Sequence, residues 1–148
     1  MKIGIAGVGG IGSNVAVHLV RAGIKDFKLA DFDKVEKSNL NRQFYFQDQI
    51  GQYKVDMLEE NLKRINDSVS IEKMVLKLDK ANMKEFYEDC DIIVEGFDVK
   101  ELKKELLEVF AFGGKTVVSA NGIGGMDTDN IKTKQLGNNI FVVGDFES

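Results

Sequence analysis

Short apolar runs alternate along the chain with segments in which apolar residues recur every three or four positions. The runs predict buried strands and the periodic segments predict helices with one apolar face. Such alternation is typical of a parallel sheet whose strands are joined by helices. Strands are expected at 2–6, 26–31, 69–77, 91–95 and 115–120, and helices at 10–22, 51–65, 81–88 and 99–112. The intervening segment 32–50 is polar and irregular, and so long a connection is usually functional.

Two further strands are expected at the end of the chain, near 131–136 and 139–144, after a Gly-rich loop at 121–130. Their short connection predicts an antiparallel hairpin at the sheet edge. The fold class is therefore α/β: a Rossmann-like, mostly parallel, doubly wound sheet with antiparallel C-terminal edge strands. We expect one domain over 1–148. Its helices are thin cover for two sheet faces, which predicts that a longer chain supplies further C-terminal elements.

Composition narrows the function classes. Hydrophobic residues make up 43% of the chain and charged residues 30%, as in a globular protein, and the net charge of −4 argues against broad binding of nucleic acid. We expect no membrane span and no signal peptide, and therefore a cytoplasmic location. The one cysteine, Cys90, excludes an internal disulfide and is expected to pack in the core. The one histidine, His18, is expected to be partly buried in its helix.

A glycine-rich loop joins the first strand to the first helix. Gly7, Gly9, Gly10 and Gly12 directly follow the first apolar run. Glycines let the backbone approach an anion closely, and the helix that follows offers unpaired N–H groups. Asp31 ends the second strand, at the distance expected for a carboxylate that holds ribose hydroxyls. A tight turn without a ligand is the alternative, but the combination favours a nucleotide site.

Basic groups suited to a triphosphate follow the second strand. Arg42 offers a planar fork of donors, and Lys54 offers a point charge in the first turn of a helix, where anions are also attracted. Asp33 is expected either to face this site or to belong to a solvated acidic turn. An ordinary charged surface loop is the alternative for Arg42 and Lys54.

Asp98 follows the strand 91–95 at the carboxyl edge of the sheet, where doubly wound folds bind ligands. A carboxylate there can hold Mg²⁺ between phosphates. Asp is also a good N-cap for the helix that follows, and the two roles are compatible.

The order and spacing of these segments resemble the ThiF/MoeB/HesA family, the adenylating relatives of ubiquitin-activating enzymes. The resemblance covers essentially the whole chain and looks closest to the short ThiF-like proteins assigned to thiamine biosynthesis. Its most specific part is the Asn-Leu-Asn-Arg-Gln segment with a lysine downstream. The matching residues are Gly7–Ser13, Asp31–Asp33, Ser38–Gln43, Gly51–Lys54 and Asp98.

The resemblance implies a reaction. Family members bind Mg·ATP, and the C-terminal Gly-Gly carboxylate of a ubiquitin-fold sulfur carrier attacks the α-phosphate to give an acyl-adenylate and pyrophosphate. It also implies a homodimer. The implied catalytic residues are Arg42, Lys54 and Asp98, with Asp98 as the metal ligand. The implied nucleotide-binding residues are Gly7, Gly9, Gly10, Gly12, Asp31, Asp33, Ser38, Asn39, Asn41, Arg42, Lys54 and Asp98, with Asp31 on the ribose and Asn39, Arg42 and Lys54 on the phosphates.

The chain also departs from the family pattern. Val99 stands where many relatives have asparagine, and Lys103 where many have arginine. The family's arginine segment before the first strand and its functional cysteines do not occur in these residues. Four readings therefore stand beside a thiamine carrier: a molybdopterin-type carrier, a HesA-like tRNA-modifying activity, an NAD-binding oxidoreductase, and a nucleotide-binding module without turnover. The oxidoreductase reading draws only on the glycine loop and Asp31.

Overall fold

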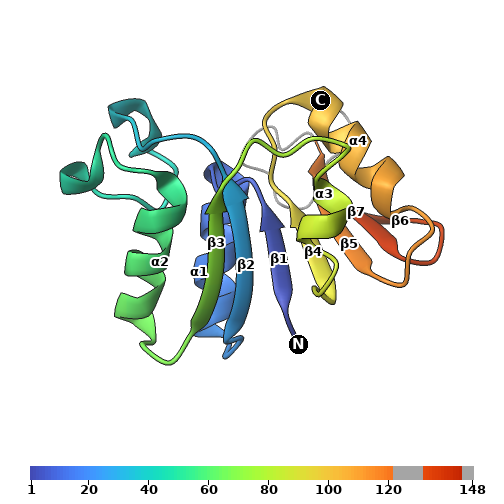
Figure 1. Ribbon diagram of the computed structural model, residues 1–148, viewed down its shortest axis with the longest axis horizontal. Helices are drawn as coiled ribbons and strands as arrows, with labels where there is room; N and C mark the ends of the chain where they lie inside the picture. The colour runs from blue at the N-terminus through green and yellow to red at the C-terminus, as the bar shows by residue number, and fades with distance from the viewer. Residues whose placement is uncertain (122–131, 145–148) are drawn as a thin grey trace.

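The computed structural model describes residues 1–121 and 132–144. They form a seven-stranded sheet with the order β3-β2-β1-β4-β5-β7-β6 (Figure 1). All pairings are parallel except that of β6 with β7, which is antiparallel. This confirms the predicted Rossmann-like fold class. The strands are β1 Ile3–Ala6, β2 Asp26–Asp31, β3 Ser70–Val75, β4 Ile92–Glu95, β5 Thr116–Asn121, β6 Lys132–Leu136 and β7 Ile140–Gly144.

The α-helices are α1 Gly10–Arg21, α2 Lys54–Ile65, α3 Met83–Phe86 and α4 Lys100–Phe110. None of the helices in the described ranges is long and apolar enough to cross a membrane.

Helix α2 begins three residues later than the pattern predicts, because Gly51 turns with a φ of 90° and its N–H donates to the carbonyl of Val35. The irregular connection before it contains two short 3₁₀ turns, Lys37–Asn39 and Gln47–Gln49. Of the expected Gly-rich loop, residues 122–130 lie outside the described residues.

The sheet has an apolar core on each face, because successive strand residues point to opposite sides. Ile5 and Leu29 belong to the core under α1 and α2, whereas their neighbours Ala6 and Ala30 belong to the core under α3 and α4. Figure 1 shows α1 and α2 beside β1–β3, and α3 and α4 beside the strands that follow. The sheet is therefore doubly wound, as expected.

The sequence analysis predicted burial for Cys90 and partial burial for His18, and only the first prediction is confirmed. Cys90 is 2% exposed and belongs to the core under α3 and α4, as predicted. Burial, and the negative charge of Asp89, raise the pKa of its thiol to about 11, so it stays protonated near neutral pH. The prediction for His18 was wrong, since it is exposed on α1. Helix α1 turns Ala16, Val17 and Val20 inward, and this phase carries His18 to solvent.

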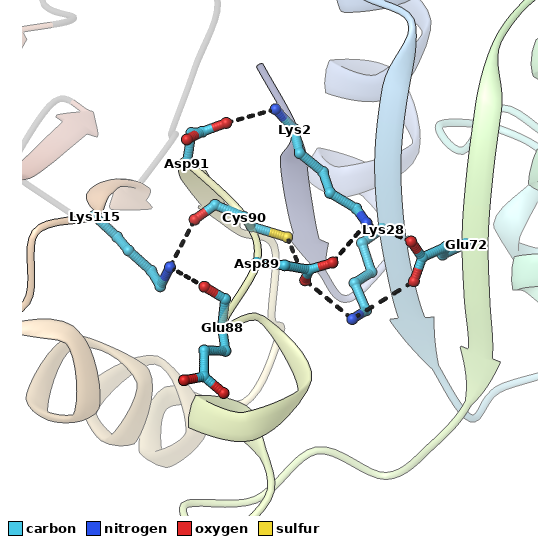
Figure 2. Close-up of polar contacts among 8 residues, drawn as sticks. All are labelled: Lys2, Lys28, Glu72, Glu88, Asp89, Cys90, Asp91 and Lys115. Carbon is cyan, nitrogen blue, oxygen red and sulfur yellow. Dashed lines mark hydrogen bonds and ion pairs between the residues drawn. The ribbon is translucent and has the colours of Figure 1, made fainter.

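A cluster of charges closes the amino ends of the strands, opposite the glycine loop (Figure 2). The Nζ of Lys2 lies 2.7 Å from Asp89 Oδ2, and the Nζ of Lys28 lies 3.1 Å from Asp89 Oδ1. Both lysines also pair with Glu72 on β3. The Asp91 carboxylate accepts a hydrogen bond of 2.8 Å from the backbone N–H of Lys2. The cluster thus joins the first three strands to the segment before β4.

This cluster predicts a measurable acid sensitivity. Hydrogen bonds from Lys2 and Lys28 lower the pKa of Asp89 to about 2 from its ordinary 3.8. A lowered pKa stabilises the folded state above pH 3.8, and this contribution is lost as pH falls toward 2. Asp89→Asn should lower the free energy of unfolding at pH 7 by less than about 1 kcal/mol, because solvent screens a half-exposed pair. It should also flatten the acid dependence of urea unfolding, whereas Glu88→Gln should not. An acid profile identical to that of the unaltered protein would contradict this prediction.

Candidate functional site

Backbone packing between three glycines shapes the loop after β1. A Cβ at Gly12 would lie 1.9 Å from the carbonyl oxygen of Gly7, and one at Gly96 would lie 2.7 Å from the same oxygen. Gly7 itself has a φ of 85°. Gly12 and Gly96 are therefore required so that α1 and the turn after β4 can approach the loop. Gly96 was not singled out in the sequence, because it lies far along the chain from the glycine loop.

Gly9 and Gly10 have a different environment. A Cβ at Gly9 would lie 3.5 Å from the Nε2 of Gln43, and one at Gly10 would lie 3.9 Å from the Nε of Arg42. Their nearest neighbours are thus polar side chains of the following connection rather than backbone. Gly10 thus faces Arg42, which the sequence analysis assigned to phosphate binding, and Gly9 faces Gln43.

The Asp31 carboxylate lies against the glycine loop. Its Oδ2 accepts a hydrogen bond of 2.9 Å from the N–H of Val8, and its Oδ1 accepts one of 2.8 Å from the N–H of Asp33. Burial raises the pKa of Asp31, and these two hydrogen bonds oppose the rise. Each oxygen keeps further acceptor capacity, which suits ribose hydroxyls.

Lys54 is the first residue of α2 and only 6% of it is exposed. Its backbone N–H donates to the carbonyl of Asp33 at 3.0 Å, but its Nζ lies 4.0 Å from Asp33 Oδ2, a long ion pair. A buried ammonium without a close counter-ion is costly. Its position at a helix N-terminus adds to the local positive potential. The arrangement favours an anionic ligand.

Arg42 is held at the start of α1. Its guanidinium donates to the carbonyl of Ser38 at 2.9 Å and to Asn41 Oδ1 at 3.0 Å. Its own carbonyl accepts a hydrogen bond of 2.7 Å from Asn14, which also donates to the carbonyl of Gly10. These contacts place the guanidinium beside the open part of the glycine loop.

The other predicted residues of this connection shape it from within. Ser38 and Asn41 are exposed and contact Arg42, through a backbone carbonyl and a side-chain amide. Asn39 is buried, and its Oδ1 accepts a hydrogen bond of 2.8 Å from the N–H of Glu36. In the structure these three residues organise the connection around Arg42.

Buried polar side chains that the sequence analysis missed clamp the same connection. Gln49 Nε2 donates to Asn61 Oδ1 at 2.6 Å, and Asn61 returns a hydrogen bond of 3.0 Å to Gln49 Oε1. Asn61 also donates to the carbonyl of Phe44 at 2.9 Å, and Ser13 Oγ accepts from the N–H of Phe44 at 3.1 Å. The sequence offered one signal for these residues: Ser13 and Asn61 each lie next to the apolar face of their helix, where a polar side chain is partly buried and needs a partner.

One buried polar atom points to a missing partner. Gln43 is 6% exposed, and its Oε1 has no hydrogen-bond partner among the described residues. Its amide group lies beside Gly9, in the direction in which a Cβ at that position would point. Buried amide oxygens are rarely left without a donor. The orphaned oxygen of Gln43 fits a ligand group that donates a hydrogen bond, such as a hydroxyl or an amino group, whereas the open face of the glycine loop and the ammonium of Lys54 fit a phosphate.

Asp98 lies in the turn between β4 and α4, and it is exposed. The N-cap of α4 is Val99, and no side-chain hydrogen bond caps the helix. The expected alternative role of Asp98 as a helix cap is therefore not what the structure shows. Its carboxylate stays available to a ligand.

A cavity of about 160 Å³ brings six of the predicted residues together: Gly7, Gly9, Asp31, Asp33, Lys54 and Asp98. Apolar side chains of Phe32, Leu76, Leu78 and Leu102 line its other walls. Gly10, Gly12, Ser38, Asn39, Asn41 and Arg42 are not among its lining residues. No cluster of three or more His, Cys, Asp or Glu side chains suited to a metal occurs in residues 1–121 and 132–144. Mg²⁺, however, is commonly held by one carboxylate together with substrate phosphates.

A larger cavity of about 510 Å³ lies between α4 and the strands β5, β6 and β7. Its walls include Leu107, Ile140 and Val142, and none of the predicted site residues. The smaller cavity is the candidate site despite its size, because it gathers the glycines, the carboxylates and the buried cation.

These features define an α/β domain of the doubly wound class, with a cavity whose groups suit a nucleotide. The ThiF family model matches residues 1–137, and the chain belongs to the ThiF family. The chain is 35% identical to adenylyltransferase and sulfurtransferase UBA4 of Eremothecium gossypii over 124 residues, which is 83% of this chain and 28% of that protein. It is 38% identical to ubiquitin-like modifier-activating enzyme 5 of Bombyx mori over 94 residues, 64% of this chain and 23% of that protein. The chain thus spans less than a third of these relatives.

The structure of the chain is also similar to solved structures of two Escherichia coli proteins. The Escherichia coli tRNA N6-threonylcarbamoyladenosine dehydratase TcdA, in complex with AMP, superposes with a TM-score of 0.84 at 25% identity, over 90% of this chain and 55% of that one. Escherichia coli MccB with MccA-N7isoASN superposes with a TM-score of 0.76 at 28% identity, over 83% of this chain and 37% of that one. The family resemblance read from the sequence is confirmed at this level, and the link to thiamine remains a prediction.

The close glycine packing predicts a sharp difference between two alanine variants. Gly12→Ala forces a Cβ against the Gly7 carbonyl, whereas Gly114 has nothing within 4 Å of the corresponding position. Gly12→Ala should lower the free energy of unfolding by about 2 kcal/mol or more, as overpacked cores do. Gly114→Ala should stay within about 0.5 kcal/mol. Urea unfolding measures both. Equal stability of the two variants would contradict the packing described here.

Proposed function

We propose that this domain binds Mg·ATP and transfers AMP to the C-terminal Gly-Gly carboxylate of a ubiquitin-fold sulfur carrier protein of the thiamine type. One observation carries the proposal. The buried ammonium of Lys54 shares a cavity with Asp31, Asp33 and Asp98, and the one ion pair that it makes among the described residues is the long one, 4.0 Å, with Asp33. The domain would be the nucleotide-binding part of the enzyme.

Each part of the cavity suits one part of the nucleotide. The Asp31 carboxylate would accept hydrogen bonds from the ribose hydroxyls, and the apolar wall of Phe32, Leu76 and Leu78 would contact the base. The phosphates would lie toward Lys54, Arg42 and the N-terminus of α1, where positive charge and free N–H groups converge. Asp98 would hold Mg²⁺, which neutralises phosphate charge when bound.

The reaction needs no protein nucleophile. An oxygen of the carrier carboxylate forms a bond to the α-phosphorus, and the bond from that phosphorus to the bridging oxygen breaks. Pyrophosphate leaves with the electron pair of the broken bond, and no proton has to move in this step. The contribution of Lys54 and Arg42 would be to offset the charge that builds on the phosphates, and that of the loop would be to align the reactants.

Chemistry on this chain favours a protein carboxylate as the substrate. The enzyme of Bombyx mori is named for activating a ubiquitin-like modifier and UBA4 for adenylyl and sulfur transfer, whereas TcdA is named for a modified tRNA base. The net charge of −4 argues against a tRNA surface on this domain. A molybdopterin-type carrier would use the same chemistry, and the test below separates it by the carrier supplied. An NAD-binding oxidoreductase leaves Arg42 and Lys54 unexplained.

Exchange of labelled pyrophosphate into ATP, with Mg²⁺ and one purified carrier at a time, tests the reaction. Exchange should depend on the carrier, and the carrier that supports it identifies the pathway. Lys54→Ala and Arg42→Ala should each slow exchange by about 10²-fold or more, because each removes charge stabilisation from the transition state. Lys37→Ala, an exposed lysine of the same connection, should leave the rate unchanged. Nucleotide binding without exchange for every carrier would refute the adenylation proposal and leave a binding module.

The sheet face on the side of α1 supports a second proposal, that of a homodimer. A cavity of about 450 Å³ lies over β1, β4, β5 and β7 on this face and is lined mainly by apolar side chains, among them Ile11, Val15, Val94 and Val118. Parallel sheets are normally covered on both faces. A second copy of the chain would bury this surface.

Val118→Lys places a charge on this apolar face and should convert a dimer to a monomer. Light scattering coupled to size-exclusion chromatography measures the mass directly. Lys132→Glu, a charge change on the exposed strand β6, serves as the control and should keep the dimer. A monomeric mass for the unaltered protein at all concentrations would refute the dimer.

A further inference from the structure

A wholly buried carboxylate lies at the carboxyl end of β4 and has no part in the proposed chemistry. Glu95 is the last residue of that strand and is 0% exposed. Its Oε1 accepts a hydrogen bond of 2.6 Å from Ser119 Oγ, and its Oε2 accepts one of 2.6 Å from the N–H of Phe97. The Nζ of Lys103 lies 3.2 Å from Oε1 and 3.1 Å from Oε2.

Such a group is tolerated only when its charge is fully compensated. Burial of a lone carboxylate is costly, and several charge-assisted hydrogen bonds with good geometry offset that cost. Here the partners come from three elements: Ser119 on β5, Lys103 on α4 and the backbone of the turn that follows β4. Lys103 also donates to the carbonyl of Ala120 at 3.4 Å. The cluster therefore connects α4 to β4 and β5.

The turn that begins at Glu95 carries Asp98. Its first residue, Gly96, donates its N–H to the carbonyl of Ala6 at 2.8 Å and packs against the Gly7 carbonyl. Its next residue, Phe97, donates to Glu95. Its far end continues into α4, which Lys103 fastens to Glu95. Asp98 itself makes no recorded side-chain hydrogen bond or ion pair within the described part of the chain, so the two ends of the turn set its place.

We propose that the Glu95–Lys103 pair positions Asp98 and thereby sets the affinity of the ATP site for Mg²⁺. Neither residue lines the cavity assigned to the nucleotide, so both are positioning residues. This inference rests on the proposed function of Asp98 as the magnesium ligand. Outer partners that orient a metal ligand typically change metal affinity by 10- to 100-fold when they are lost.

The test measures binding rather than turnover. The dissociation constant of ATP is determined by calorimetry over a range of Mg²⁺ concentrations, and that of AMP is determined without the metal. Magnesium is expected to tighten ATP binding, and the Mg²⁺ concentration that gives half of this tightening is called the half-effect concentration. Lys103→Met and Glu95→Gln should raise it by about tenfold, in the same direction as Asp98→Asn. AMP binding without Mg²⁺ should stay within about twofold. Lys103→Arg, which keeps a cation on α4, should behave like the unaltered protein.

Lys104→Met is the matched control, because Lys104 is the next residue of α4, is exposed, and within residues 1–121 and 132–144 pairs only with Glu108, at 4.0 Å. It should leave the Mg²⁺ dependence unchanged. If Lys103→Met or Glu95→Gln fails to fold, Ser119→Ala takes their place, since it removes one hydrogen bond and leaves the ion pair. It should raise the half-effect concentration by about threefold, the effect of losing one hydrogen bond.

Two outcomes would overturn the proposal, and they can be told apart. Folded Lys103→Met, Glu95→Gln or Ser119→Ala protein with the Mg²⁺ dependence of the unaltered protein would show that the cluster is merely structural. ATP binding by the unaltered protein that does not respond to Mg²⁺ would refute the role of Asp98 in the proposed function, and the positioning role with it.

Discussion

The carbonyl oxygen of Gly7 is the point on which the site depends. Gly12 of α1 and Gly96 of the turn after β4 both approach it so closely that neither position has room for a Cβ. This contact brings the start of α1, the end of β1 and the turn after β4 to one place at the sheet edge. Asp31 reaches the same place by bonding the N–H of Val8. The relative positions of the ligand-facing groups are thus set by backbone contacts, which leave little freedom to adjust.

Buried polar side chains complete what the backbone contact begins. Gln49 and Asn61 fasten the connection that carries Arg42, and Glu95 fastens the turn that carries Asp98. Each cluster holds an exposed residue of the candidate site. Hydrogen bonds fix direction as well as distance, whereas apolar packing fixes mainly volume. An arrangement of this kind holds charged groups in place before a ligand arrives.

The fold could be predicted from the sequence because apolar periodicity reports directly which side of each element is buried. The cavity residues Asp31, Lys54 and Asp98 were predictable because each stands just past a strand or at a helix start. Glu95 and Asn61 were not: Glu95 is a single polar residue at the end of an apolar strand, Asn61 is one polar residue among many in an amphipathic helix, and nothing in the sequence marks either as buried. The start of α2 was misplaced because Gly51 reads as helix-compatible until its contact with Val35 is known. The burial of His18 was misjudged because adjacent helix residues point about 100° apart, so that Val17 is buried while His18, the next residue, is exposed.

The antiparallel strand β6 has a consequence for the behaviour of the protein in a crowded cell. Every residue of β6 is exposed, and it forms the outer edge of the sheet. An open edge invites another strand to add to it, which is how sheets begin to aggregate. Lys132 and Lys134 stand two apart on this strand and so project from the same side. Charged side chains, lysine above all, are among the features by which edge strands discourage pairing with another chain.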